Sequence, residues 1–272
     1  MTDDTSRDDS PRDGTLRDWL GQPDPDVDPL RAARQAGKPA LPKRFYAEAG
    51  VAAAEDGHRL VLDGRPARTP GRRLIAVPQA AVAEALAEEW GAQETVIDPA
   101  RMPLTRLVNT ALDGVAERRE AVAEDAARYA GSDLLVYRAG DPARLVASQA
   151  AAWDPVLDWA RTDLGARFML SEGVMHVAQP EESLRAVRQA VDAVGSPLAL
   201  AGLHVMTTLT GSVLLALAVL RGRLTAEEAW AAAQVDETFQ ASVWGRDEEA
   251  EARRALRREE FMAAAKLVAL TA

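Results

Sequence analysis

At 272 residues the chain is longer than one hydrophobic core usually supports, so its length predicts two domains. The formal net charge of −10 argues against a surface for nucleic acid or anionic membranes, because phosphate binding depends on clustered Lys and Arg. The sequence has no cysteine, which excludes a disulfide scaffold, thiolate metal ligands and a cysteine nucleophile, and is typical of a reducing compartment.

Residues 1–42 are rich in Asp, Arg, Pro and Gly and show little apolar periodicity, which predicts a flexible N-terminal arm. Within it, Leu16, Trp19 and Leu20 could form a short docking helix. The acidic residues at its start are unlike a secretory signal or a mitochondrial presequence, so we expect a cytoplasmic, bacterial protein.

Residues 43–140 combine short strand signals with helical ones, which predicts a small α+β domain. Apolar alternation begins at Phe45, and a Leu-Val-Leu run ends at Asp63-Gly64, a step typical of a hairpin turn. Further strands are expected over 72–77 and 133–138. Helices are expected after Pro78 up to Gly91, and then over about 104–112 and 116–130.

Residues 141–272 lose the strand signals and are predicted to form an all-α helical bundle domain. Ser196 and Pro197 are typical of an N-cap and the first residue of a helix. Thr225 and Glu228 have capping-box spacing, which predicts a helix from there to about Trp244, and a last helix is expected over 253–270. The fold class is therefore α+β.

The stretch 198–220 has no Asp, Glu, Lys or Arg and is long enough to span a bilayer. His204, several hydroxyl residues and two glycines interrupt it, and no second such segment follows. We therefore predict a buried central helix or helix pair, without membrane insertion.

Sequence signatures of catalysis and ligand binding are missing. There is no phosphate-binding glycine loop, and the residues around Ser212 lack the second glycine of a nucleophile elbow. The three histidines, His58, His176 and His204, have no metal-site spacing. We expect no catalytic residues, no metal, no cofactor and no small-molecule substrate.

One helical stripe near the C-terminus has the composition of a protein-binding site. If the helix continues past Gly245, it places on one face the residues Glu237, Gln240, Trp244 and Glu248. Val235, Phe239 and Val243 would form the neighbouring face toward the core. An indole among carboxylates and an amide is typical of an interaction hot spot, although Trp244 could instead pack between the two domains.

Several short motifs, in one order over residues 43–250, are similar to those of the Atp12 family of F1 ATP synthase assembly chaperones. They are Lys-Arg-Phe-Tyr at 43–46, Leu-Asp-Gly-Arg at 62–65, Thr-Pro at 69–70, Glu-Trp at 89–90 with Gln93, Met-Pro-Leu-Thr at 102–105, Asn-Thr-Ala at 109–111, Asp-Leu-Leu-Val-Tyr at 133–137, Gln149, Trp-Asp-Pro at 153–155, Thr-Gly-Ser at 210–212, and Asp236, Glu237, Gln240, Trp244, Gly245 and Glu248.

This resemblance implies an N-terminal α+β domain, a C-terminal helical domain and a chaperone function. The family binds the unassembled F1 α subunit and keeps it from aggregating until β takes its place. The acidic residue after Trp-Gly is associated with function in relatives, and by position that role falls on Glu248.

Two other classes stay open on the residues alone. A small-molecule enzyme would use a cleft between the domains, with Arg65, Arg106 or Glu248 as its polar residues. A structural component of a larger complex would remain bound in the final assembly.

Overall fold

The structure is a computed structural model, and it describes residues 41–173 and 175–271. The predicted arm and its docking helix at Leu16, Trp19 and Leu20 lie outside the described residues, apart from residues 41 and 42.

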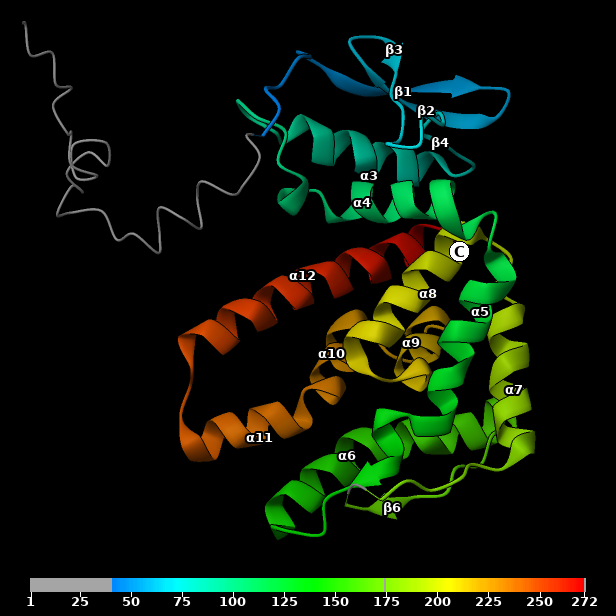
Figure 1. Cartoon of the computed structure of the whole chain (residues 1–272), viewed down its shortest axis with the longest axis vertical. Helices are drawn as coiled ribbons and strands as arrows, with labels where there is room; N and C mark the ends of the chain where they lie inside the picture. The colour runs from blue at the N-terminus through cyan, green and yellow to red at the C-terminus, as the bar shows by residue number, and fades with distance from the viewer. Residues whose placement is uncertain (1–40, 174, 272) are drawn as a thin grey trace, which may run out of the picture. The chain divides into compact units, whose positions relative to one another are not determined.

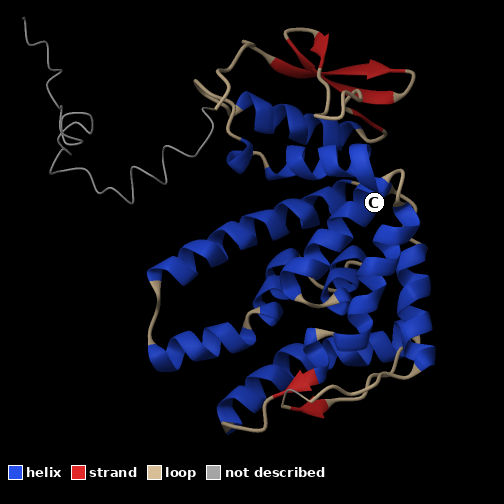
Figure 2. Ribbon diagram, in the orientation of Figure 1, coloured by secondary structure: helices blue, strands red, loops and turns tan. Residues whose placement is uncertain are grey.

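A small antiparallel sheet opens the described chain (Figures 1 and 2). Strand β1 (Ala49–Ala54) pairs along its whole length with β2 (Gly57–Leu62), and β2 also pairs with the short strands β3 (Arg65–Pro66) and β4 (Ala76–Val77). Asp63 and Gly64 both have positive φ, at 48° and 76°, and form the tight turn predicted for this dipeptide. Of the strand expected over 72–77, only the two residues of β4 pair as a strand.

Two helices follow the sheet. Helix α3 (Ala80–Gly91) packs against β1 and β2 through an apolar stripe that includes Val82 and Leu86. Helix α4 (Pro103–Thr110) packs against α3, and its N-terminus is capped from that neighbour. The Glu89 carboxylate accepts hydrogen bonds from the amides of Leu104 at 2.9 Å and Thr105 at 2.7 Å. This cap satisfies amides that no helical carbonyl can reach.

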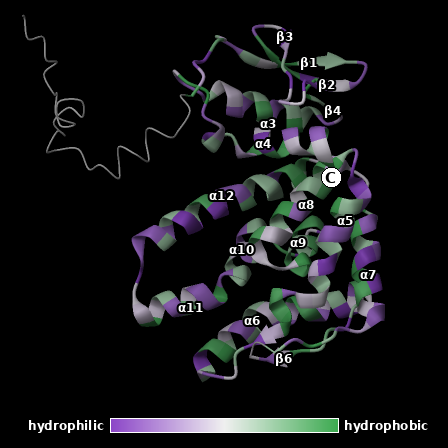
Figure 3. Cartoon of the chain, viewed as in Figure 1, coloured by the Kyte–Doolittle hydropathy of each residue, from purple (hydrophilic) through white to green (hydrophobic). Residues whose placement is uncertain are grey.

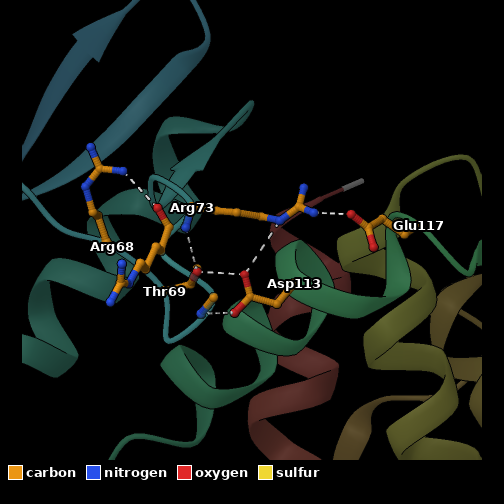
Figure 4. A network of polar contacts seen from close by, with 7 residues as sticks. Arg68, Thr69, Arg73, Asp113 and Glu117 are labelled. Atoms are coloured by element: carbon orange, nitrogen blue, oxygen red, sulfur yellow. Dashed lines mark hydrogen bonds and ion pairs between the residues drawn. The ribbon is translucent and has the colours of Figure 1, made fainter.

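Asp113 connects the loop between β3 and β4 to the π-helix η2 (Ala111–Val115), as Figure 4 shows. Its carboxylate accepts hydrogen bonds from the Thr69 hydroxyl at 2.7 Å and the Gly71 amide at 2.9 Å. Arg73 lies 3.8 Å from the same carboxylate and also pairs with Glu117. A Cβ atom at Gly71 would lie 2.7 Å from this carboxylate, so a larger residue there would displace the Asp113 side chain.

The rest of the described chain consists of helices joined by loops, with two short strands that pair in parallel, β5 (Tyr137–Arg138) and β6 (Ser171–Glu172). The central helix α8 packs against α5, α9 and α12. The helices are α5 (Arg119–Arg128), α6 (Ala143–Trp159), α7 (Glu181–Asp192), α8 (Pro197–Thr210), α9 (Val213–Leu220), α10 (Ala226–Ala233), α11 (Val235–Trp244) and α12 (Glu248–Leu270).

The apolar run 198–220 is confirmed as a buried helix pair. Gly211 ends α8 with a φ of 71°, and Ser212 caps α9 by accepting a hydrogen bond from the Leu215 amide at 3.0 Å. Every residue of α9 from Val213 to Ala218 is buried. Within the described residues, no helix combines the length and the apolarity that crossing a membrane requires.

A buried carboxylate joins this helix pair to the segment 133–138, which was predicted as a strand. Asp133 is fully buried and accepts hydrogen bonds from the amides of Leu135 and Leu214, both at 3.1 Å. Because Asp133 caps the next residues, Leu134–Val136 form a 3-10 turn, and only Tyr137–Arg138 remain extended. Burial raises the pKa of Asp133 to about 6, although hydrogen bonds from Ser212 and nearby amides act in the opposite direction.

Candidate functional site

Helix α11 and the first half of α12 form an exposed arm, defined here as residues 235–258. No residue of α11 is buried, and the buried residues of α12 begin only at Phe261. Figure 1 shows both helices extending away from the other helices and meeting at the loop 245–247. Figure 3 shows that the outer half of α12 is mostly hydrophilic, in contrast to α9. The arm therefore makes few contacts with the hydrophobic core.

The predicted helix over 225–244 is two helices, and it does not continue past Gly245. A first break falls at Gln234, between α10 and α11. Gly245 then ends α11 with a φ of 91°, and Asp247 caps α12 by accepting a hydrogen bond from the Glu249 amide at 2.9 Å. Glu248 is the first residue of α12, so the single stripe predicted through this position is wrong.

Three of the four predicted site residues nevertheless line one groove. Glu237, Gln240 and Trp244 on α11 face Arg253 and other residues of α12 across a groove of about 420 Å³. Trp244 is 86% exposed, the largest exposure among the large apolar side chains of the described residues. Glu248 is exposed on α12 and does not line this groove.

The apolar face of α11 does not turn into the core as predicted. Val235 packs partly against the core, but Val243 is 53% exposed. Phe239 is half-buried and lines a second groove, of about 630 Å³, together with Arg144 on α6, Trp230 on α10 and residues of α12. The physical reason is that α11 lies against α6 rather than over the bundle centre.

Polar contacts hold α11 against α6. Gln149 donates a hydrogen bond to the Asp236 carboxylate at 2.7 Å and accepts one from the Ala139 amide at 2.8 Å. Close by, the indole N–H of Trp153 donates to the carbonyl of Ala232 at 2.7 Å, at the end of α10. These contacts fix the base of the arm, because each satisfies a polar group that is buried or nearly so.

A single hydrogen bond joins the two helices of the arm within the described residues. Arg254 on α12 donates to the Thr238 hydroxyl on α11 at 3.1 Å. Other charges pair within α12, as Arg253 does with Glu249 at 2.6 Å. Such exposed pairs add little stability, so the arm keeps a polar surface with an indole at its tip.

The residues proposed for an enzymatic cleft are not brought together. Arg106 pairs with Glu260 at 3.0 Å in a small groove beside α4, and neither Arg65 nor Glu248 lines that groove. Asp133, the carboxyl group with the raised pKa, lines neither groove of the arm. His204 pairs with Asp125 at 2.8 Å, and no cluster of metal-ligating side chains occurs in the described part of the chain.

Sequence reasoning missed the residues that surround the arm. Arg144, Trp230 and Arg258 line the larger groove, but they come from three different helices, and no spacing in the sequence relates them. The break at Gly245 could have been found, since Asp247 followed by three acidic residues within the next four is typical of a helix start.

Comparisons with known proteins agree on one family. The family model described as "ATP12 chaperone protein" matches residues 43–161. The mitochondrial protein atp12 of Schizosaccharomyces pombe is 23% identical over 220 residues, covering 76% of this chain and 75% of the relative.

Solved structures extend the match over most of the chain. The protein in a crystal structure from Agrobacterium tumefaciens is 51% identical in sequence to this chain. The structural match covers 93% of both chains, with a TM-score of 0.82. The crystal structure of Atp12 from Paracoccus denitrificans is 44% identical, with a TM-score of 0.79, and the match covers 85% of this chain and 99% of that one. With its sequence and its fold both matched over nearly the whole of a solved Atp12, this chain belongs to the ATP12 chaperone family.

Proposed function

We propose that this chain is a chaperone that binds the unassembled α subunit of F1 ATP synthase and keeps it competent for assembly with β. An isolated α subunit exposes the surface that normally meets β, and such surfaces favour aggregation. Membership of the ATP12 family supports a chaperone, and the similarity of its motifs to the family of F1 ATP synthase assembly chaperones supports ATP synthase as the system that it serves. In this proposal the chain binds a protein surface, performs no bond-making chemistry and works in the bacterial cytoplasm.

The observation that carries the proposal is the arm with Trp244 at the tip of α11. A tryptophan that is 86% exposed adds no stability to the fold of the chain itself. Large aromatic side chains concentrate binding energy at protein interfaces when a partner buries them. We assign Trp244 the role of the apolar contact, with Glu237 and Gln240 beside it in the same groove.

Glu248 is assigned a charged contact with a basic group on the α subunit. It is exposed at the start of α12, one loop away from Trp244. The same position also stabilises the helix, because a carboxylate in the first turn interacts favourably with the helix dipole. A test of Glu248 must therefore separate binding from helix stability.

The test is co-expression of the α subunit with this chain, measuring the soluble fraction of α. We expect Trp244→Ala and Glu248→Lys each to lower the amount of soluble α severalfold, because each removes a contact that only the complex makes. Glu259→Lys is the control for Glu248→Lys, since it puts the same charge change at an exposed position of the same helix that lines neither groove of the arm. The control for Trp244→Ala is Met175→Ala, at a residue that is 75% exposed in the loop between β6 and α7.

Each variant is checked by thermal unfolding so that a folding defect is not scored as lost binding. Equal rescue of α by the wild type and by Glu248→Lys would remove Glu248 from the mechanism. Failure of the wild-type chain to raise soluble α would reject the α subunit as its partner. Recovery of the chain with mature F1 would instead indicate a structural component.

A further inference from the structure

The larger groove of the arm, called here the Phe239 groove, has a firm apolar floor. Trp230 is 5% exposed, and its ring lies 5.4 Å from the ring of Phe261, which is fully buried. Val235 and Phe239 are half-buried along the same groove. The volume of about 630 Å³ lies in the range of sites that receive large apolar groups. Because Trp230 rests on the core, this floor is formed before any partner arrives.

The rims of the groove carry guanidinium groups from opposite sides. Arg144 lies in the first turn of α6, and Arg258 lies on α12. Both are exposed, and neither forms an ion pair with another residue of the described chain. Arg254, which also lines the groove, is already engaged with Glu251 at 3.6 Å and with Thr238.

Carboxylates are fewer in this lining than guanidinium groups. Glu251 faces Arg254, and Glu227 lies exposed on α10. The lining thus holds three arginines against two glutamates, within a chain whose formal net charge is −10. The local charge of the groove is opposite in sign to that of the whole molecule, which favours an acidic partner at this place.

We propose that the Phe239 groove binds a segment of the client protein in which a large apolar side chain is flanked by carboxylates. The apolar side chain lies on Trp230, Val235 and Phe239, and the carboxylates pair with Arg144 and Arg258. This is the groove mode of peptide recognition, in which apolar anchors give affinity and charged rims fix the orientation. The inference rests on the proposed chaperone function and adds the chemistry of the bound segment.

The two sides of the arm then select opposite charges. Glu248 is assigned to a basic group of the client, whereas Arg144 and Arg258 select acidic groups at the other groove. Two contacts of opposite sign orient the client on the arm, because the reversed orientation places like charges together.

The first experiment uses the purified full chain and two fluorescein-labelled peptides. One peptide has the sequence Glu-Asp-Leu-Phe-Glu-Asp, and the other replaces each acidic residue by Lys. We expect the acidic peptide to bind more tightly, with an affinity that falls as salt is raised. The double variant Arg144→Glu/Arg258→Glu is expected to bind the acidic peptide about tenfold more weakly and the basic peptide more tightly.

A control variant, Arg161→Glu, makes the same kind of change at an exposed arginine outside the groove. It should leave the affinities for both peptides unchanged. Phe239→Ala is expected to weaken both peptides alike, since it removes apolar contact and no charge. Equal binding of the two peptides by the wild type, or an unchanged preference in the double variant, overturns the inference.

The same variants in the co-expression assay separate this inference from the proposed function. If wild type and double variant rescue the α subunit equally, the groove has no part in client binding, although the chaperone function stands. If the peptides discriminate as expected but α stays insoluble with the wild type, the groove stands and the client is another protein.

Discussion

At the scale of single residues, Asp133 is a carboxyl group placed where water cannot reach it. The segment at 133 and the junction between α8 and α9 meet at this side chain, which two amides bind at 3.1 Å. Because this one buried carboxylate binds two chain segments, the stability of the core depends on whether Asp133 is protonated. Its pKa, raised to about 6 by burial, can be tested directly.

We predict that Asp133 makes the chain less stable as pH rises from about 4 to about 7. The folded-state pKa of about 6 exceeds the ordinary value of 3.8, so in this range the folded chain holds a proton that the unfolded chain has released. The stabilisation is complete below the lower pKa and is lost as pH rises through the upper one. It amounts to roughly 3 kcal/mol by the usual conversion of a pKa difference.

The measurement is urea unfolding of the wild type and of Asp133→Asn at several pH values. The free energy of unfolding of the wild type, minus that of the variant, should fall by up to about 3 kcal/mol over this range. Other carboxylates titrate alike in both proteins and cancel in the difference. A difference that stays constant with pH would show that the pKa of Asp133 is not raised.

At the scale of elements, α8 and α12 approach each other closely at Gly202. A Cβ atom at Gly202 would lie 2.7 Å from Cγ2 of Val268 and 2.9 Å from the carbonyl oxygen of Ala264. The second of these is a backbone atom, so α12 would have to move as a whole. This contact fixes the buried half of α12, from which the outer half extends.

We predict that Gly202→Ala lowers the free energy of unfolding by about 1–3 kcal/mol, because overpacking outweighs the better helix propensity of alanine. The control is Gly91→Ala, at the end of α3, where an added Cβ would meet nothing within 4 Å. That variant should be neutral or slightly stabilised. Chemical denaturation of both measures the effect, and equal stabilities would show that α8 and α12 can separate without cost.

Element boundaries were predictable wherever one side chain decides them. Ser196 caps α8, Thr225 and Glu228 form the predicted capping box of α10, and Asp63-Gly64 makes the expected turn. These signals are local, since the residue and the amides that it satisfies lie within three positions of each other.

Other elements depend on partners that are distant in the sequence. The strand expected at 133–138 becomes a turn that Asp133 caps at the Leu135 amide, and the same carboxylate is held in place by the Leu214 amide, 81 positions away. The break at Gln234 has no glycine or proline to mark it, and it leaves Ala232 oriented toward Trp153. Local sequence propensity cannot predict either contact, because each joins residues that are far apart in the sequence.

Spacing in the sequence relates three residues of the candidate site but does not give its geometry, and their role in binding stays a prediction. Trp244 with nearby Glu237 and Gln240 was found from spacing, and the three line one groove. A stripe that includes Glu248 requires a helix that continues past Gly245, whereas Gly245 ends α11 and Glu248 begins α12. The Phe239 groove is formed by α6, α10, α11 and α12 together, so only the tertiary fold could define it.

At the scale of the whole molecule, burial is concentrated away from the arm. Most residues of α8 and α9 are buried, whereas α11 has no buried residue. The class predicted from the sequence, a small strand-containing region followed by helices, is confirmed. The division into domains at residue 140 stays a prediction.

We predict that amide hydrogen exchange in the free chain follows this distribution of burial. The amides of α8 and α9 should exchange slowest, and those of residues 235–258 much faster, because opening the arm exposes little apolar surface. Exchange followed by mass spectrometry of peptides measures this difference. Equal protection of the arm and of α8 would show that the arm opens only when the whole protein unfolds.

The hydrogen bond between Arg254 and Thr238 limits how firmly the distance between α11 and α12 is set. A bond of this kind contributes about 1 kcal/mol, which is only about twice the thermal energy. We therefore expect the separation of the two helices to fluctuate at room temperature while their bases stay fixed. Under the proposed function, a client held between them could be exchanged contact by contact for a competing subunit without any unfolding of the buried core.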